Sequence, residues 1–156
     1  MIRINNINIF VEELRQWANE RLLVYNNEVM PQYQEGGWEA WVQVELTMWL
    51  RQRGYDVARE CQCYTTNSYR ADLCLNATQS IPPKLVIEIK CQSINSTFDS
   101  MIRAINDDTE KGYFLDSFDH MYELVFVYDR RLFEALNQYR QVLVTDKIAI
   151  LINQVN

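Results

Sequence analysis

The sequence lacks a long hydrophobic run and a secretory signal. No apolar stretch approaches the length of about 20 residues that a helix needs to cross a bilayer. The first six residues contain no basic stretch followed by an apolar one, which is the pattern of a signal peptide. We therefore expect a cytoplasmic protein without a membrane-spanning segment.

The sequence also lacks the residue spacings of a zinc site. His120 is the only histidine, and no Cys-x-x-Cys pair occurs. The four cysteines, Cys61, Cys63, Cys74 and Cys91, all lie in strand-like segments. This placement is typical of reduced thiols in a cytoplasmic protein, and a disulfide is the alternative.

Basic residues are not in excess. The chain has 15 Lys and Arg against 21 Asp and Glu, and its net charge is −6. A nucleic-acid-binding protein normally shows a basic footprint, because neutralising phosphates supplies most of its non-specific affinity. A nucleic-acid site would therefore need basic side chains that converge locally. The candidates are Arg51, Arg53, Arg59, Arg70, Lys84, Arg103, Lys111, Arg130 and Arg131.

Length and composition predict one globular domain over residues 1–156. The hydrophobic content of 48% and the charged content of 23% are ordinary for such a domain, and the length allows a full core. No internal repeat or low-complexity tract occurs. Helical and strand patterns alternate, which predicts an α/β fold with a mixed central sheet flanked by helices.

The boundaries of the expected elements follow hydrophobic periodicity and turn residues. Helices are expected over 7–24, over 38–53 with Gly54 at its end, from about Phe98 onward, and over 130–139. Strands are expected over 55–64, 69–75, 84–92, 121–128 and 148–152, and a loop over 25–37. In the helix that begins near Phe98, the side chains expected to face the sheet are Met101, Ile102, Ile105, Tyr113 and Phe114.

The strand over residues 84–92 carries an unusual pair of charges. Leu85, Ile87 and Ile89 alternate on one face, which places Glu88, Lys90 and Gln92 together on the other. Burying ionised groups is costly unless they are paired or bind a metal. A pair at the exposed end of an edge strand is the simpler explanation.

A second strand favours a metal site. Tyr69 to Leu75 also alternates, with Asp72 on the face opposite Leu73 and Leu75. A carboxylate in each of two neighbouring apolar strands, with a lysine two residues after the second, is an arrangement that can hold a divalent cation beside a phosphate.

These residues carry a family resemblance. Asp72, followed after 15 residues by Glu88-Ile-Lys90, resembles the core motif of the PD-(D/E)XK nuclease superfamily. The resemblance covers residues 37–130 and implies a restriction-endonuclease-like αβββαβ core, to which residues 1–36 add an N-terminal helix and loop. It implies a nuclease that cleaves phosphodiester bonds, expected in DNA, with Mg²⁺ or Mn²⁺ as cofactor.

The resemblance assigns roles to individual residues. It implies that Asp72, Glu88 and a helix glutamate hold the metal, and that Lys90 positions or deprotonates the attacking water or neutralises the transition state. Glu45 is favoured as the helix glutamate over Glu39, with Gln43 as a helper if Glu39 is the right one. Supporting candidates are Gln92 for the water or a phosphate, Arg70 as a basic residue, and Lys111, which either contacts phosphate or forms a surface pair with Asp108.

Three hypotheses about function remain open. The first is a metal-dependent nuclease; Gly37–Leu46 and Ile87–Ser93 are similar to restriction-endonuclease-like domains of bacterial toxins and defence systems. The second, favoured by the acidic charge, is a catalytically inactive binding or regulatory module on the same fold. The third is an immunity-type protein whose acidic face occupies a basic partner. A homodimer is a further possibility, because enzymes that cut both strands often pair two such sites.

Overall fold

The computed structural model describes residues 1–25 and 38–156, and the loop expected over 25–37 lies outside these residues from position 26 onward. The helices are α1 (Ile7–Trp17), α3 (Trp38–Gln52), α4 (Phe98–Lys111) and α5 (Arg130–Ala135), with a π-helical turn at Ala18–Leu22 and 3-10 turns at Leu23–Tyr25 and Gly112–Phe114. The strands are β1 (Val57–Cys61), β2 (Ala71–Leu75), β3 (Leu85–Cys91), β4 (His120–Val127), β5 (Arg140–Val144) and β6 (Ala149–Gln154). No helix in these ranges is long and apolar enough to span a membrane.

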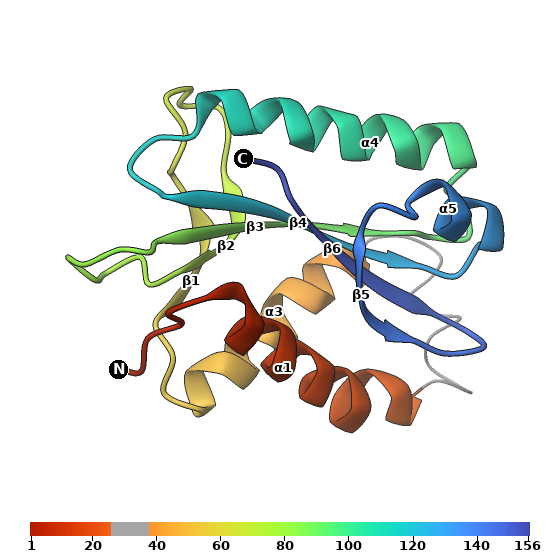
Figure 1. The fold of residues 1–156 in the computed structure, drawn as a ribbon, viewed down its shortest axis with the longest axis horizontal. Helices are drawn as coiled ribbons and strands as arrows, with labels where there is room; N and C mark the ends of the chain where they lie inside the picture. The colour runs from red at the N-terminus through yellow and green to blue at the C-terminus, as the bar shows by residue number, and fades with distance from the viewer. Residues whose placement is uncertain (26–37) are drawn as a thin grey trace.

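In the described part of the chain, the six strands form one mixed sheet in the order β1-β2-β3-β4-β6-β5 (Figure 1). β3 and β4 are parallel, and every other neighbouring pair is antiparallel. Two parallel neighbours need a crossover connection, and α4 supplies it. The expected α/β class with a mixed sheet and flanking helices is therefore confirmed.

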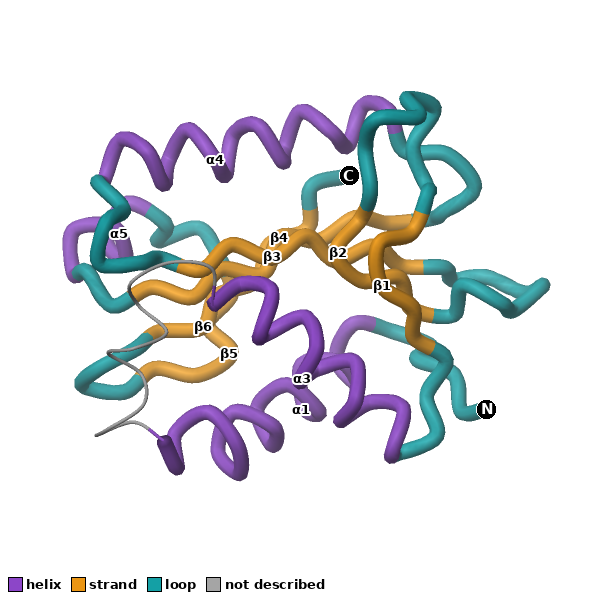
Figure 2. The backbone as a smooth tube through the Cα atoms, turned by 180° about the vertical axis from the view of Figure 1, so that it is seen from behind, coloured by secondary structure: helices purple, strands orange, loops and turns teal. Residues whose placement is uncertain are grey.

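The helices cover the sheet in two layers. α1 and α3 lie against one face and α4 lies across the other, as the view from behind also shows (Figure 2). Trp17 and Phe126 pack edge to face in the core of the first layer, with ring centroids 6.2 Å apart. In the second layer, Met101 and Ile105 of α4 pack with residues of β4, α5 and β6. Each face of the sheet is therefore covered by helices.

Helix ends are set by local chemistry. Thr97 caps α4 through a capping box with Ser100, in which each side chain accepts a hydrogen bond from the other residue's backbone N–H. The Asn6 side chain accepts bonds from the first N–H groups of α1. Gly54, expected to follow the second helix, has φ of 86°, a conformation that favours glycine after a helix end.

Three expectations about the elements were wrong. The helix expected over 130–139 ends at Ala135, whereas the segment expected to be helical over 7–24 is helical, as an α-helix to Trp17 and then as π and 3-10 turns. β5 was not expected. It is an edge strand whose buried and exposed residues do not alternate, so it lacks the period-two pattern by which strands are predicted. Tyr113 and Phe114 do not face the sheet: α4 ends at Lys111, and the following 3-10 turn leaves their side chains 87% and 41% exposed.

Candidate active site

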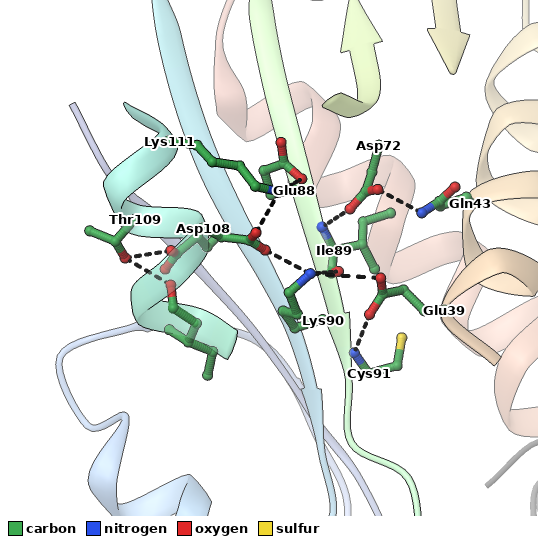
Figure 3. A network of polar contacts seen from close by, with 12 residues as sticks. Glu39, Gln43, Asp72, Glu88, Ile89, Lys90, Cys91, Asp108, Thr109 and Lys111 are labelled. Atoms are coloured by element: carbon green, nitrogen blue, oxygen red, sulfur yellow. Dashed lines mark hydrogen bonds and ion pairs between the residues drawn. The ribbon is translucent and has the colours of Figure 1, made fainter. Parts of the chain in front are cut away.

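The pairing of β2 with β3 stops beside the candidate carboxylates. Leu73 opposite Ile87 is the last pair of the ladder, so Asp72 and Glu88 would form the next one. Instead, the Asp72 side chain turns toward β3, and its Oδ2 accepts a hydrogen bond from the Ile89 N–H at 2.6 Å (Figure 3). The gap between the strands thus places the Asp72 carboxylate at the open edge of β3.

Glu39 occupies the same open edge one step further along β3. Its Oε2 accepts a hydrogen bond from the Cys91 N–H at 3.4 Å. Because backbone groups alternate between the two edges of a strand, the Ile89 and Cys91 amides point to this edge, whereas the Gln92 amide bonds to β4. Two carboxylates therefore replace the backbone acceptors that β2 no longer supplies.

Gln43 joins α3 to this arrangement. It lies one helical turn after Glu39 and donates from Nε2 to Asp72 Oδ1 at 2.7 Å. Its Oε1 accepts a hydrogen bond from Arg59 Nη2 at 3.2 Å, which orients the amide. Asp72 is thus held on both oxygens, one by α3 and one by β3.

Glu88 lies deeper than Asp72, with 1% of its surface exposed. The Tyr64 hydroxyl donates to its Oε1, and Lys111 Nζ is 3.5 Å from Oε2. Burial raises the pKa of Glu88 to about 8, and the negative charges of Asp72 and Asp108 add to the effect of burial. Burial also raises the pKa of Asp72. Burial and the neighbouring carboxylates therefore both disfavour the charged form of Glu88.

Asp108 of α4 bridges the two lysines of the site. Its Oδ2 is 2.8 Å from Lys90 Nζ and its Oδ1 is 2.7 Å from Lys111 Nζ, while Glu39 Oε1 is 3.7 Å from Lys90 Nζ. Burial alone would lower the pKa of Lys90, but the carboxylates of Asp108 and Glu39 outweigh burial and raise it. Lys90 is therefore held as an ammonium ion.

A row of polar side chains continues across the sheet beneath α4. Glu88 of β3 stands opposite Glu123 of β4, which stands opposite Asn153 of β6. Glu123 is 1% exposed, and it accepts hydrogen bonds from Thr109 Oγ1 at 2.6 Å and from the Tyr139 hydroxyl. The buried side of the candidate site is thus a polar row that crosses several strands.

The structure brings together most of the residues expected at the site. Asp72, Glu88 and Lys90 meet at the open edge, as the strand periodicity predicted. Lys111, left open between a surface pair and a substrate contact, is 22% exposed and joins the same cluster. The helix glutamate in the cluster is Glu39.

The preference for Glu45 was wrong. Glu45 is half-buried on the side of α3 that faces α1, in a hollow that it shares with Trp17 and Arg21. Glu45 comes six positions after Glu39, so at about 100° per residue the two side chains point about 120° apart around the helix axis. Because α1 covers the side of Glu45, only Glu39 reaches β3.

Gln92 and Arg70 are not part of the cluster either. Gln92 Oε1 accepts hydrogen bonds from the backbone N–H groups of Tyr128 and Asp129, both at 3.0 Å, so this side chain joins the end of β3 to the end of β4. Arg70 is exposed, and its Nη1 donates to the carbonyls of Asn67 and Tyr69 within its own turn.

Sequence reasoning missed Tyr64, Glu123 and the bridging role of Asp108. The spacing of Asp108 and Lys111 indicated a pair, but it could not indicate that both would lie against β3. Tyr64 was expected at the end of the strand over 55–64, but β1 ends at Cys61, and Tyr64 reaches Glu88 only through the tertiary fold. Glu123 could have been suspected because it is a charged residue within an otherwise apolar strand.

The donor set suits a hard cation in its chemistry. Asp72 and Glu88 supply carboxylate oxygens, and the Ile89 carbonyl lies on the same edge, 3.4 Å from Lys90 Nζ. Magnesium is commonly held by one or two carboxylates together with water and substrate phosphate. Among residues 1–25 and 38–156, no three His, Cys, Asp or Glu side chains are arranged to hold a metal ion by themselves. To hold a metal ion, Asp72 and Glu88 would therefore need further oxygens, from water or from a phosphate.

Comparisons with known proteins leave the family of this chain open: no protein-family model matches it, and neither a curated protein nor a solved structure does.

Proposed function

We propose that this chain is a metal-dependent nuclease of the PD-(D/E)XK type, with DNA as the expected substrate. The observation that carries the proposal is the meeting of the Asp72 and Glu88 carboxylates with the Lys90 ammonium at the open edge of β3. The order α3-β1-β2-β3-α4-β4 supports it, because it is the αβββαβ order that the motif implies, with α1 as the additional N-terminal helix.

Asp72 and Glu88 would hold Mg²⁺ or Mn²⁺, with the Ile89 carbonyl as a third oxygen. When bound, such an ion would polarise the phosphate and lower the pKa of a bound water. Gln43 and the Ile89 N–H orient the Asp72 carboxylate, and orientation of a ligand by neighbouring groups raises metal affinity. Glu39 helps to fix β3 at this edge.

Lys90 acts through its charge. Its raised pKa keeps the side chain protonated at neutral pH, so it is suited to stabilising negative charge on the transferring phosphate rather than to removing a proton from water. Lys111 places a second ammonium 3.5 Å from Glu88 and can contact the same phosphate. Both lysines are less than one quarter exposed, so their charges are poorly screened.

The second candidate is a catalytically inactive protein on the same fold that serves as a binding, regulatory or immunity-type protein. Two observations favour it. The net charge of −6 opposes binding of nucleic acid, and Asp108 already pairs with both lysines. In that case the cluster would be a buried ion network with a structural role.

Cleavage assays separate the two candidates. Purified protein would be incubated with plasmid, single-stranded DNA and RNA, in Mg²⁺ or Mn²⁺ and in chelator. The nuclease proposal predicts metal-dependent cleavage that Asp72→Asn and Lys90→Met each reduce by about 100-fold or more, whereas the matched control Glu45→Gln retains it. Full cleavage by Asp72→Asn would refute the assignment, and folded protein that cleaves none of these substrates would favour the inactive alternative.

A further inference from the structure

An exposed aromatic surface lies next to the candidate site. Phe114 packs on the half-buried Tyr69, and Tyr113 precedes Phe114 in the same 3-10 turn; we call these three residues the aromatic platform. Tyr113 is 87% exposed and Phe114 is 41% exposed, although both follow a helix whose apolar residues otherwise pack on the sheet. Several large exposed apolar side chains close together usually mark a binding surface.

The backbone beneath the platform is held in place. The Thr65 N–H donates to the Phe114 carbonyl at 2.8 Å, and the Asp116 N–H donates to the Cys63 carbonyl at 2.8 Å. These bonds flank an isolated antiparallel bridge between Tyr64 and Leu115. The turn that carries Phe114 is therefore tied to the segment between β1 and β2, and its aromatic side chains are presented from a fixed backbone.

The platform is continuous with the candidate site. The Phe114 ring packs edge to face on Tyr69 at 6.0 Å between centroids, and Tyr69 packs in the same way on Tyr64 at 6.0 Å. The Tyr64 hydroxyl donates to Glu88, and Lys111 Nζ lies 6.0 Å from the centre of the Tyr69 ring. A chain of three aromatic rings thus leads from the surface to the carboxylate that would hold the metal.

We propose that the aromatic platform stacks an unpaired base of a single-stranded DNA substrate, so that the neighbouring phosphate reaches Asp72 and Lys90. This inference rests on the proposed nuclease function and names its substrate class. Aromatic rings can stack on any base, and the stacking part of the affinity does not come from phosphate contacts. It therefore supplies the affinity that a chain of net charge −6 cannot obtain from phosphate contacts alone.

The geometry favours a single strand over a duplex. In a duplex, the faces of the bases are stacked on each other, and exposing one of them requires unstacking and unpairing. An unpaired strand offers its base faces freely. Positive charge for the backbone is available near Tyr69, from the exposed Arg70 that follows it in sequence and from Lys111, whose Nζ lies 6.0 Å from the centre of the ring.

Binding without cleavage tests the platform separately from the nuclease proposal. Fluorescence anisotropy in chelator would compare a labelled single-stranded DNA oligonucleotide with a blunt duplex of the same length. The double variant Tyr113→Ala/Phe114→Ala should bind the single strand about 5- to 150-fold more weakly, as expected for the loss of one stacked base, and bind the duplex as the wild type does. The control Val44→Ala/Met48→Ala removes two exposed apolar side chains of α3 and should change neither.

Abasic oligonucleotides identify the stacked base. An abasic site removes one base and keeps its phosphate. At one or two positions of the oligonucleotide, this replacement should weaken binding to the wild-type protein. Binding to the double variant should not change. Should Phe114→Ala disturb the fold, Tyr113→Ala alone gives the same comparison. Three results would each refute base stacking by the platform. Wild type and double variant could bind the single strand equally well, neither could bind it, or the substitutions could change the oligomeric state without changing the affinity. Stacking as expected without cleavage in Mg²⁺ would leave the platform standing and refute the nuclease proposal instead.

Discussion

The Asp72 carboxylate accepts a hydrogen bond from the Ile89 N–H at 2.6 Å, in the place where a backbone carbonyl of β2 would accept it if the strands continued to pair. Asp72 therefore has two tasks, because it completes the edge of β3 and supplies a carboxylate to the site.

The double task of Asp72 predicts different effects of two substitutions on stability. Asp72→Ala leaves the Ile89 N–H without its acceptor and should lower the free energy of unfolding by about 1–3 kcal/mol. Asp72→Asn retains an acceptor oxygen and should lower it by less. Urea denaturation measures both, and equal losses would show that the hydrogen bond to Ile89 contributes little.

The position of Glu39 predicts which helix glutamate matters for activity. Glu39→Gln removes the charge that pairs with Lys90 and should reduce cleavage by about 10- to 100-fold, as is typical of groups that orient site residues. Glu45→Gln, on the same helix but facing α1, should have no effect on cleavage. The reverse order of effects would mean that Glu45, not Glu39, acts at the site.

The raised pKa of Glu88 predicts a pH-dependent metal affinity. With a pKa of about 8, this carboxyl holds a proton at pH 7 and must release it to bind a cation. Mn²⁺ affinity measured by calorimetry should therefore rise up to about tenfold per pH unit between pH 6 and 8 and level off above pH 8. Asp72 and Asp108 raise this pKa and Lys111 lowers it, so Asp108→Asn should move the rise to lower pH. An affinity that does not change over this range would contradict the prediction.

Glu123 predicts a loss of stability with rising pH. Burial raises its pKa above the ordinary 4.5, so above pH 4.5 the unfolded chain releases a proton that the folded chain keeps. Its contribution to stability is therefore complete below pH 4.5 and is lost as the pH rises through the folded pKa. The free energy of unfolding of Glu123→Gln relative to wild type should therefore be higher at pH 8 than at pH 4.5, by about 1.4 kcal/mol for each tenfold difference in proton affinity between the folded and unfolded chain. Urea denaturation at the two pH values measures these free energies. A wild type that becomes more stable relative to Glu123→Gln at pH 8 would contradict the prediction.

Gln92 predicts a change in stability without a change in chemistry. Gln92→Ala removes the acceptor of two backbone N–H groups at the start of the turn after β4 and should lower the free energy of unfolding by about 1–3 kcal/mol. The cleavage rate, measured well below the melting temperature, should stay within about twofold of wild type, because the side chain points away from Lys90 toward β4. If folded Gln92→Ala lost most of its cleavage activity, Gln92 would instead bind the attacking water or a phosphate, as the sequence suggested.

Strand periodicity was sufficient to predict that Asp72, Glu88 and Lys90 lie together, because alternation fixes the face of each residue once a strand is assigned. It was insufficient for Gln92, which lies just past the end of β3, where the alternation no longer determines direction. The choice between Glu39 and Glu45 could not be made from α3 alone. That choice depends on which side of α3 is covered by α1, a contact between distant parts of the chain.

The contribution of α4 to the site could not be predicted either, because it also depends on contacts between distant parts of the chain. Asp108 and Lys111 lie in an amphipathic helix, where charged residues are usually solvated. Only the crossover between the parallel strands β3 and β4 brings them over Glu88 and Lys90. The aromatic platform was missed because apolar residues directly after a helix were expected to continue its buried stripe.

The alignment of Glu88, Glu123 and Asn153 on adjacent strands also protects the fold against misregistration. Sliding β4 by one residue would turn Glu123 into the apolar layer beneath α1 and α3, where an ionisable group has no partner. Single-residue insertions or deletions inside β3 or β4 should therefore abolish folding, whereas the same changes in the exposed turn between β5 and β6 should be tolerated.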